Sequence, residues 1–360
     1  ASFLNANDIS NIFSRVTGGN ISNIDGLISA NGSANLFLIN PAGIVFGEGA
    51  RLDIGGSFYG SSASSILFED GEFSATDLDN PPLLTINAPI GLGFRDQPGD
   101  IVNRSQVNDG NGLQVDTGKN ITLLGGNINF DGGRIFAPGG IVNLGGLTTA
   151  GTVSFTEDGS LSFPEGVTRG DVSLANSSGV GVFAAEGGSI FVNAKNLDLT
   201  SGSSLVAGIG EGLGSVNAQA GDIVINATES VTLDGISTDG SSRSGIFNQV
   251  EADAVGNGGA LNITTTNLAL SNGGVISTST GGQGNGGTID INATKLVTVD
   301  ASGIFNTVQV GATGNGGALN ITTPNLTLDN GSGILASTFG DGDGGSISIN
   351  ATDVVLTNAK

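Results

Sequence analysis

The chain contains Gly256-Asn257-Gly258-Gly259-Ala260-Leu261-Asn262-Ile263-Thr264-Thr265, and the same ten residues return 58 positions later as Gly314 through Thr323. In each copy a Gly-Gly pair is followed by apolar residues two and four positions on, as at Leu261 and Ile263. Because side chains alternate between the two faces of a strand, this spacing predicts a strand with one apolar face. The repeat predicts one structural unit that is used many times.

The same unit recurs through the second half of the chain at intervals of roughly 28 to 38 residues. Its strands begin after Gly188, Gly221, Gly259, Gly287, Gly317 and Gly345. A second and a third short strand are predicted to follow in each unit, such as Leu268-Ala269-Leu270 and Val275-Ile276-Ser277. One such coil cannot bury its own apolar face, whereas stacked coils build a continuous apolar column. The predicted fold is all-β, a right-handed parallel β-helix of roughly 28–38-residue coils with a few extra-helical loops or hairpins.

The composition agrees with many short strands joined by tight turns, because 63 of 360 residues are Gly and β-branched residues are frequent. The net charge is −22 with only 11 basic residues, so the surface repels phosphate backbones and no nucleic-acid partner is expected. The chain has no apolar run long enough for a transmembrane helix, and no membrane span is predicted.

The absence of Cys and His limits the chemistry that this chain can perform. Without them, disulfides, Cys/His zinc sites and Ser-His or Cys-His nucleophile pairs cannot form. The carboxylates are scattered, with Asp222, Asp234 and Asp253 at unmatched strand positions. We therefore predict that the chain is not an enzyme and needs no cofactor.

The first half follows the same pattern less regularly. Residues 120–128 predict strand, turn and strand, whereas Glu69 to Pro82 is irregular and acidic. That segment, with Asp79-Asn80-Pro81-Pro82 as a break, is predicted to be a loop leaving the helix, and Thr156 to Gly170 a second excursion. No linker separates the halves, so both are expected to share one column.

A sharp turn interrupts two apolar runs at Asn40-Pro41-Ala42-Gly43-Ile44. Pro41 fixes its own φ and biases Asn40 toward an extended conformation, while Gly43 can supply the positive φ of a tight turn. The segment resembles the Asn-Pro-Asn-Gly-Ile signature of the two-partner-secretion domain of filamentous-haemagglutinin-type exoproteins, with Ala42 in place of the second Asn. The flanks, residues 12–19 and 50–58, are similar to that family as well.

The resemblance implies a domain division and a partner. Residues 1–95 would form the two-partner-secretion (haemagglutination-activity-type) domain, and residues 96–360 would continue the β-helix repeats. Asn40, Pro41, Ala42, Gly43 and Ile44 would form the secretion motif. The implied partner is an outer-membrane barrel transporter with periplasmic domains. Related exoproteins carry a segment before the Phe-Leu-Asn-Ala stretch seen here at residues 3–6, so the native polypeptide is expected to begin earlier. Lys360 falls just after a repeat unit, so the polypeptide is expected to continue there as well.

The resemblance also implies a function. The chain would be the secretion-targeting and folding-nucleating N-terminal part of a large exported adhesin-like exoprotein, secreted or displayed on the cell surface via the periplasm. Surface or glycan ligands are further candidate partners. Two alternatives remain open: a β-helical polysaccharide-processing enzyme, which would need converging carboxylates, and the stalk of a contact-dependent toxin.

Two polar patterns in the repeats allow both a structural and a binding interpretation. Asparagines recur near the strand ends, at Asn193, Asn226, Asn262, Asn292, Asn320 and Asn350. They would stack or close turns in one interpretation and bind a ligand in the other. Asp341-Gly342-Asp343-Gly344-Gly345 resembles a calcium-binding turn, but the equivalent turn in the previous copy is Gly284-Asn285-Gly286-Gly287. Ordinary turn chemistry is favoured, and no metal site is predicted.

Overall fold

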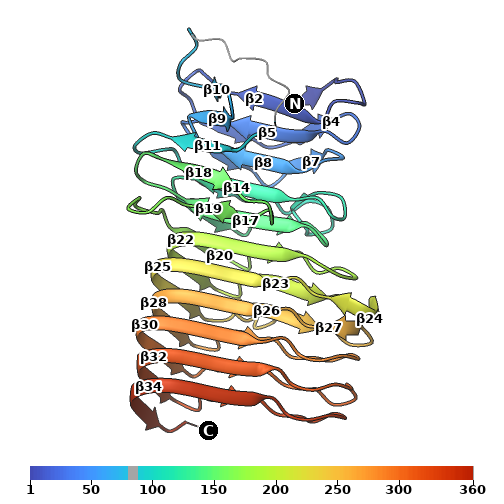
Figure 1. Ribbon diagram of the computed structural model, residues 1–360, viewed down its shortest axis with the longest axis vertical. Coiled ribbons are helices and arrows are strands. Elements are labelled where there is room, and N and C mark those ends of the chain that lie inside the picture. The colour runs from blue at the N-terminus through green and yellow to red at the C-terminus, as the bar shows by residue number, and fades with distance from the viewer. Residues whose placement is uncertain (80–87, 360) are drawn as a thin grey trace.

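The chain folds into a single column of stacked coils, with the N-terminus at one end and the C-terminus at the other (Figure 1). The structure is a computed structural model that describes residues 1–79 and 88–359. Within those residues the regular elements are strands, no helix is present, and the coils pair through parallel registers. The predicted all-β parallel β-helix is confirmed. Most of the predicted break at Asp79-Asn80-Pro81-Pro82 lies outside the described residues.

Two faces of the column are separate in the first half of the chain. One face is formed by β2 (Asn11–Arg15), β5 (Asn35–Ile39), β8 (Phe58–Ser61), β14 (Ile121–Gly125) and β17 (Ile141–Gly146). The second face is formed by β3 (Ser22–Ile24), β6 (Ile44–Phe46), β12 (Ile101–Asn103), β15 (Ile128–Asp131) and β20 (Val172–Ala175). The strand–turn–strand predicted for residues 120–128 corresponds to β14 and β15 and is confirmed.

The same two faces merge in the second half, because each coil there carries one long strand around the corner. These strands are β22 (Ser189–Thr200), β25 (Ile223–Asp234), β28 (Leu261–Ser271), β30 (Ile289–Asp300), β32 (Ala318–Asp329) and β34 (Ser346–Thr357). In most pairs the register shifts at the corner, for example between Ala194 and Asn196. The expectation of two separate short strands at this place was therefore wrong, since a bulge bends one strand instead of ending it.

The third face consists of short strands. It begins with β1 (Ser2–Phe3), β4 (Leu27–Ala30) and β7 (Arg51–Asp53). It continues with β13 (Leu113–Gln114), β16 (Arg134–Phe136), β21 (Gly179–Gly181), β23 (Ser204–Ile209), β26 (Gly245–Val250), β29 (Val275–Ser277), β31 (Gly303–Phe305) and β33 (Gly333–Leu335). Beside it, β24 (Gly214–Gln219) pairs with β27 (Val255–Asn257) in a two-stranded extension.

The coils differ in length between the two halves. In the repeat half, each strand pairs with the strand one repeat unit later, so that Leu261 is the register partner of Ile289, as the repeats predict. A coil without an insertion is shorter in the first half, where Ile121 already meets its partner at Val142. Two longer steps, from Phe58 to Ile121 and from Val142 to Ile190, leave the column and return.

The core is a column of apolar side chains in register. Nine consecutive partners on the first face are fully buried: Leu36, Phe58, Ile121, Val142, Ile190, Ile223, Leu261, Ile289 and Leu319. Burying each such side chain contributes about 1.5–3 kcal/mol. Each coil supplies one residue per column, so the apolar core continues only as far as the coils stack.

The two longer steps build a second structure outside the column. β9 (Ser65–Phe68), β10 (Gly71–Ser74), β11 (Gly91–Phe94), β18 (Gly151–Phe155) and β19 (Leu161–Ser162) form an antiparallel sheet. Its aromatic side chains pack on outward-facing rings of the first face, where Phe37 and Tyr59 stack with centroids 4.1 Å apart. The loop predicted for Glu69 to Pro82 thus contains the strand β10, and the excursion at Thr156 to Gly170 contains β19. Nothing in the sequence predicted that these strands would join one antiparallel sheet.

Candidate functional site

The side chain of Asn40 is buried beneath the turn that follows β5. It is 1% exposed, and its amide donates hydrogen bonds to the Asn20 carbonyl at 2.9 Å and the Ser22 hydroxyl at 2.8 Å. Its Oδ1 accepts the backbone N–H of Ala42 at 3.0 Å, which closes an Asx turn. Both the nitrogen and the oxygen of the amide are therefore hydrogen-bonded within the protein, so Asn40 stabilises the shape of the turn.

The backbone of the turn requires a glycine at position 43. The Gly43 N–H donates to the Asn40 carbonyl at 2.9 Å, and Gly43 has a φ of 110°. A Cβ at this position would lie 2.7 Å from the carbonyl oxygen of Asp100 in the next coil. The Ile44 N–H donates to that same oxygen at 3.1 Å. The turn and the coil beneath it are held too close for any other residue type to fit without a shift.

The structure places the five residues of the predicted motif where β5 turns into β6, with residues 40–43 in the turn and Ile44 as the first residue of β6. Ile44 is fully buried in the core, and the Pro41 carbonyl accepts the Gly99 N–H at 2.9 Å. Pro41 and Ala42 are only partly buried. Ala42, where the sequence departs from the family signature, makes its hydrogen bond to Asn40 through its backbone N–H, so that bond does not depend on its side chain.

A stack of glycines continues below the turn at the same corner. The Gly126 N–H donates to the Gly99 carbonyl at 2.9 Å, and the Lys195 N–H donates to the Gly170 carbonyl at 2.7 Å. A Cβ at Gly99 would lie 2.3 Å from the Ala42 carbonyl carbon, and one at Gly170 only 1.8 Å from the Gly126 oxygen. The corner therefore consists of backbone packed directly on backbone.

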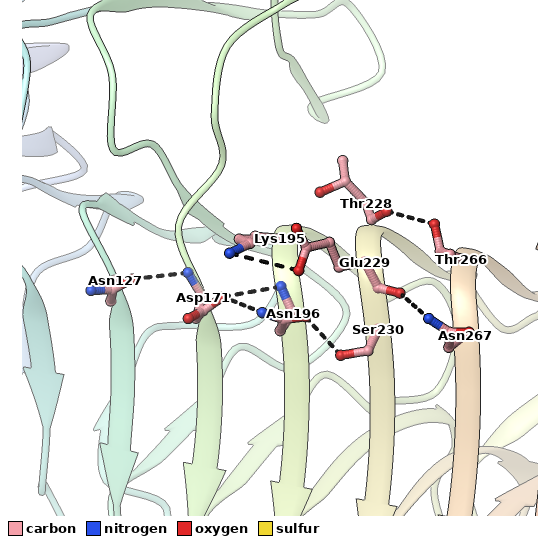
Figure 2. Close-up of polar contacts among 9 residues, drawn as sticks. All are labelled: Asn127, Asp171, Lys195, Asn196, Thr228, Glu229, Ser230, Thr266 and Asn267. Carbon is pink, nitrogen blue, oxygen red and sulfur yellow. Dashed lines mark hydrogen bonds and ion pairs between the residues drawn. The ribbon is translucent and has the colours of Figure 1, made fainter.

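Beside the glycines runs a row of Asp and Asn side chains, which Figure 2 shows from Asn127 to Ser230. The carboxylate of Asp100 accepts the Asn127 N–H at 2.8 Å, and the Asn127 amide oxygen accepts the Asp171 N–H at 2.9 Å. The Asp171 carboxylate then accepts the Asn196 N–H at 3.2 Å. Each side-chain oxygen thus satisfies a backbone donor of the next coil, which fixes the register at the corner.

The corner row weakens further down the column. Ser230 donates to Asn196 at 2.7 Å, but the next coil makes side-chain bonds to carbonyls instead, from Thr266 to Thr228 at 2.8 Å and from Asn267 to Glu229 at 3.3 Å (Figure 2). The ion pair between Lys195 and Glu229, at 3.6 Å, is exposed and adds little stability. The acceptor row that begins under the Asn40 turn therefore belongs mainly to the first half of the molecule.

Sequence reasoning missed this row, although a signal for it exists. Asp100, Asn127, Asp171 and Asn196 each immediately precede the first apolar residue of a strand on the second face. An Asx residue at that place is positioned to bond a neighbouring backbone group. The spacing between these residues varies with the insertions, so a search for a fixed period does not find them.

The asparagines predicted near the strand ends do not form a ligand-binding ladder. On the first face, the register places Thr264 and Thr322 between the coils of Asn226, Asn292 and Asn350. Asn193 and Asn226 are direct register partners, but the 58-residue repeat that follows spans two coils, so there an identical residue recurs only in every second coil. In the other predicted set, Asn320 donates to Asp290 at 2.8 Å. The structure supports the structural interpretation of these residues.

A continuous ladder does occur in the turns that contain the glycine pairs. The amide oxygen of Asn257 accepts the Asn285 N–H at 3.1 Å, that of Asn285 accepts the Asn315 N–H at 3.0 Å, and that of Asn315 accepts the Asp343 N–H at 2.9 Å. Asp343, part of the segment that resembles a calcium-binding turn, thus lies in the next rung of this ladder. Among residues 1–79 and 88–359 there is no cluster of three metal-binding side chains.

The fold and this site describe a β-helical domain with a closely packed turn in its first coils. Comparisons with known proteins show to which family this domain belongs. The family model described as the TPS secretion domain matches residues 1–180. The chain belongs to this family of secretion domains of exported proteins. The resemblance found in the sequence, to the two-partner-secretion domain, is confirmed.

A solved structure extends the similarity over the whole chain. The crystal structure of the HMW1 secretion domain from Haemophilus influenzae matches with a TM-score of 0.62 at 20% sequence identity. The match covers 99% of this chain and 88% of that one. At this identity the match establishes the shared β-helix fold. A search of curated protein sequences finds no match, and in residues 1–79 and 88–359 no helix is long and apolar enough to cross a membrane.

Proposed function

We propose that this chain is the N-terminal part of a large adhesin-like exoprotein, carried across the outer membrane by a partner barrel transporter with periplasmic domains. Residues 1–95 carry the export signal in this proposal, and residues 96–360 continue the helix outside the cell or on its surface. The single observation that supports it most is the match of the TPS secretion domain over residues 1–180, which contain the Asn40 turn.

The secretion motif acts through the shape of the turn. The Asn40 side chain is engaged within the protein, because Asn20, Ser22 and Ala42 bond both ends of its amide. Gly43 sets how closely the next coil approaches. A transporter would therefore recognise the surface that a correctly formed turn presents, and the partly exposed Pro41 and Ala42 lie on that surface.

Folding outside the cell proceeds coil by coil in this proposal. Each finished coil offers unpaired backbone edges on all three faces, and the next coil pairs with them in parallel register. Pairing buries apolar residues that were exposed, which favours folding on the outer side of the membrane. Outward movement is then assisted by folding and needs no nucleotide.

The direct test is to delete residues 1–95 from the exoprotein, leaving any preceding leader in place, and to co-express it with the partner barrel. We expect the intact protein in the medium and the shortened one retained in the periplasm, as measured by immunoblot of the two fractions. An internal deletion of residues 261–318, which removes one full period of the repeat, is the control and should be secreted. Equal secretion of the protein without residues 1–95 would contradict the proposal.

A further inference from the structure

The outer surface of the third face carries a groove that lies outside the predicted secretion motif. It consists of two adjoining hollows that share Ser204 and Val206 of β23. The upper hollow lies over β16 and β21, and the lower one lies over β26, beside the loop at residues 240–243, and has a volume of about 480 Å³. From β16 to β26 the groove crosses three coil spacings, or about 14 Å at the usual strand separation.

Aromatic rings laid over glycines form the floor of this groove. Phe136 and Phe183 lie next to each other, with ring centroids 4.9 Å apart, and a Cβ at Gly181 would meet both rings at 3.2 Å. The ring of Phe247 covers Gly245 in the same way, at 2.6 Å. The rings of Phe136 and Phe183 are tilted by 47° relative to each other, so together they form an angled apolar surface above Gly181. Phe183 remains 39% exposed.

The groove also concentrates positive charge in an acidic chain. Arg134 lines the upper hollow and Arg243 the lower one, although only 11 of 360 residues are basic and the net charge is −22. Both are exposed, and neither takes part in an ion pair in the described part of the chain. A Cβ at Gly179 would lie 3.8 Å from Cγ of Arg134, and Arg243 donates to the Gly273 carbonyl at 3.4 Å. One carboxylate, that of Glu251, lines the lower hollow.

We propose that this groove binds a carboxylated oligosaccharide, with sugar rings stacked on Phe136, Phe183 and Phe247 and carboxylates paired with Arg134 and Arg243. The C–H faces of a sugar ring are apolar and match aromatic faces, while guanidinium groups match carboxylates. Hydroxyl and amide groups of Ser204, Ser242 and Gln249 line the hollows and can bond sugar hydroxyls. Nucleic acid does not fit, because the surrounding acidic surface repels a dense phosphate backbone.

The test uses the full chain and oligogalacturonate, titrated by isothermal calorimetry at low salt. We expect saturable binding that weakens as salt is added. Phe247→Ala and Arg243→Gln should each weaken it by about fivefold or more, which corresponds to about 1 kcal/mol. Glu251→Gln should strengthen it, because it removes a like charge. The matched control is Phe305→Ala, whose ring covers Gly303 outside the groove and should leave the affinity unchanged.

Three results would overturn the proposal. The first is the absence of saturable binding. The second is an equal effect of Phe247→Ala and Phe305→Ala, which would place the ligand elsewhere. The third is equally tight binding of a neutral oligosaccharide such as a dextran fragment, which would show that the arginines do not contribute to recognition. Arg243→Gln changes an exposed loop residue, so its result does not depend on whether the Phe247 variant folds.

Discussion

The first half of the column and the repeat half bury the same kind of apolar core but fix their coils in different ways. In the repeat half, residues of one type recur from coil to coil, as in the ladder of Asn257, Asn285 and Asn315. The first half has a repeated row of its own, from Asp100 to Asn196, but it also contains features outside any repeat: the Asn40 turn, the stack of Phe37 on Tyr59, and insertions that meet in a separate sheet. A contact that is repeated in every coil stabilises each coil equally. A contact that occurs once distinguishes a single position along the column.

This difference indicates where recognition can reside. A stack of near-identical coils presents the same surface many times and gives a transporter no single position to select. The turn at residues 40–44, with its Pro and Gly, and the antiparallel sheet occur within residues 1–180, which the TPS family model matches. The two halves should therefore respond differently when equivalent residues are changed.

The largest contrast is expected between two phenylalanines. Phe37 is buried between the first face and the antiparallel sheet, so Phe37→Ala should cost about 3–5 kcal/mol through the cavity it leaves. Phe305 lies half-buried on the outer surface over Gly303, and Phe305→Ala should cost less than about 1.5 kcal/mol. Hydrogen exchange of β5 and β31 measures both locally, and equal losses would remove the distinction between the halves.

A smaller effect is expected at the turn itself. Gly43→Ala places a Cβ against the Asp100 carbonyl and forces a residue with a side chain into a φ of 110°, which should cost about 2–3 kcal/mol. Gly26→Ala is the control, because no atom lies within 4 Å of its Cβ. Urea unfolding followed by hydrogen exchange in β6 should separate the two variants. Indistinguishable curves would show that the close approach of the Asp100 carbonyl does not restrict which residue can stand at position 43.

One rung of the repeat ladder should matter less. Asn285→Ala removes the acceptor of the Asn315 N–H but leaves exposed groups that water can satisfy, so a loss of about 0.5–1 kcal/mol is expected. The amide of Asn315 should exchange faster while the melting temperature of the chain hardly changes. A cooperative loss of all later coils would instead mean that the ladder, and not the core, sets the stability of the repeat half.

The smallest expected difference concerns two similar turns, one in each half. In the first turn, hydrogen bonds from Thr156 and then from Ser160 lower the pKa of Asp158. In the second turn, hydrogen bonds from Ser237 and then from Ser241 lower the pKa of Asp239 to about 2. A carboxyl with a folded pKa below its unfolded value stabilises the turn at higher pH, and this contribution is lost as the pH falls through about 2. Carboxyl NMR titration should give low midpoints for both, and a midpoint near 4 would contradict the turn geometry.

The sequence predicted the fold because the apolar pattern of the repeats, as at Leu261 and Ile263, is sufficient to define a stacked strand. It also located the turn at residues 40–44 from its Pro, its Gly and its family signature. It could not predict that Asn40 points inward, since that depends on Asn20 and Ser22 in the preceding coil. The antiparallel sheet was missed for the same reason, because its strands β11 and β18 lie far apart in the sequence and meet only once the coils between them have formed.

The central claim, that export depends on the turn in the first coils and not on stability in general, is tested most directly by the secreted fraction of two matched variants. Asn40 and Asn306 are both buried asparagines whose amides bond backbone groups of neighbouring segments at both ends. With the partner barrel present, Asn40→Ala should leave most of the protein in the periplasm, while Asn306→Ala should be secreted nearly as well as the unchanged protein. Equal secretion of the two variants would contradict the claim.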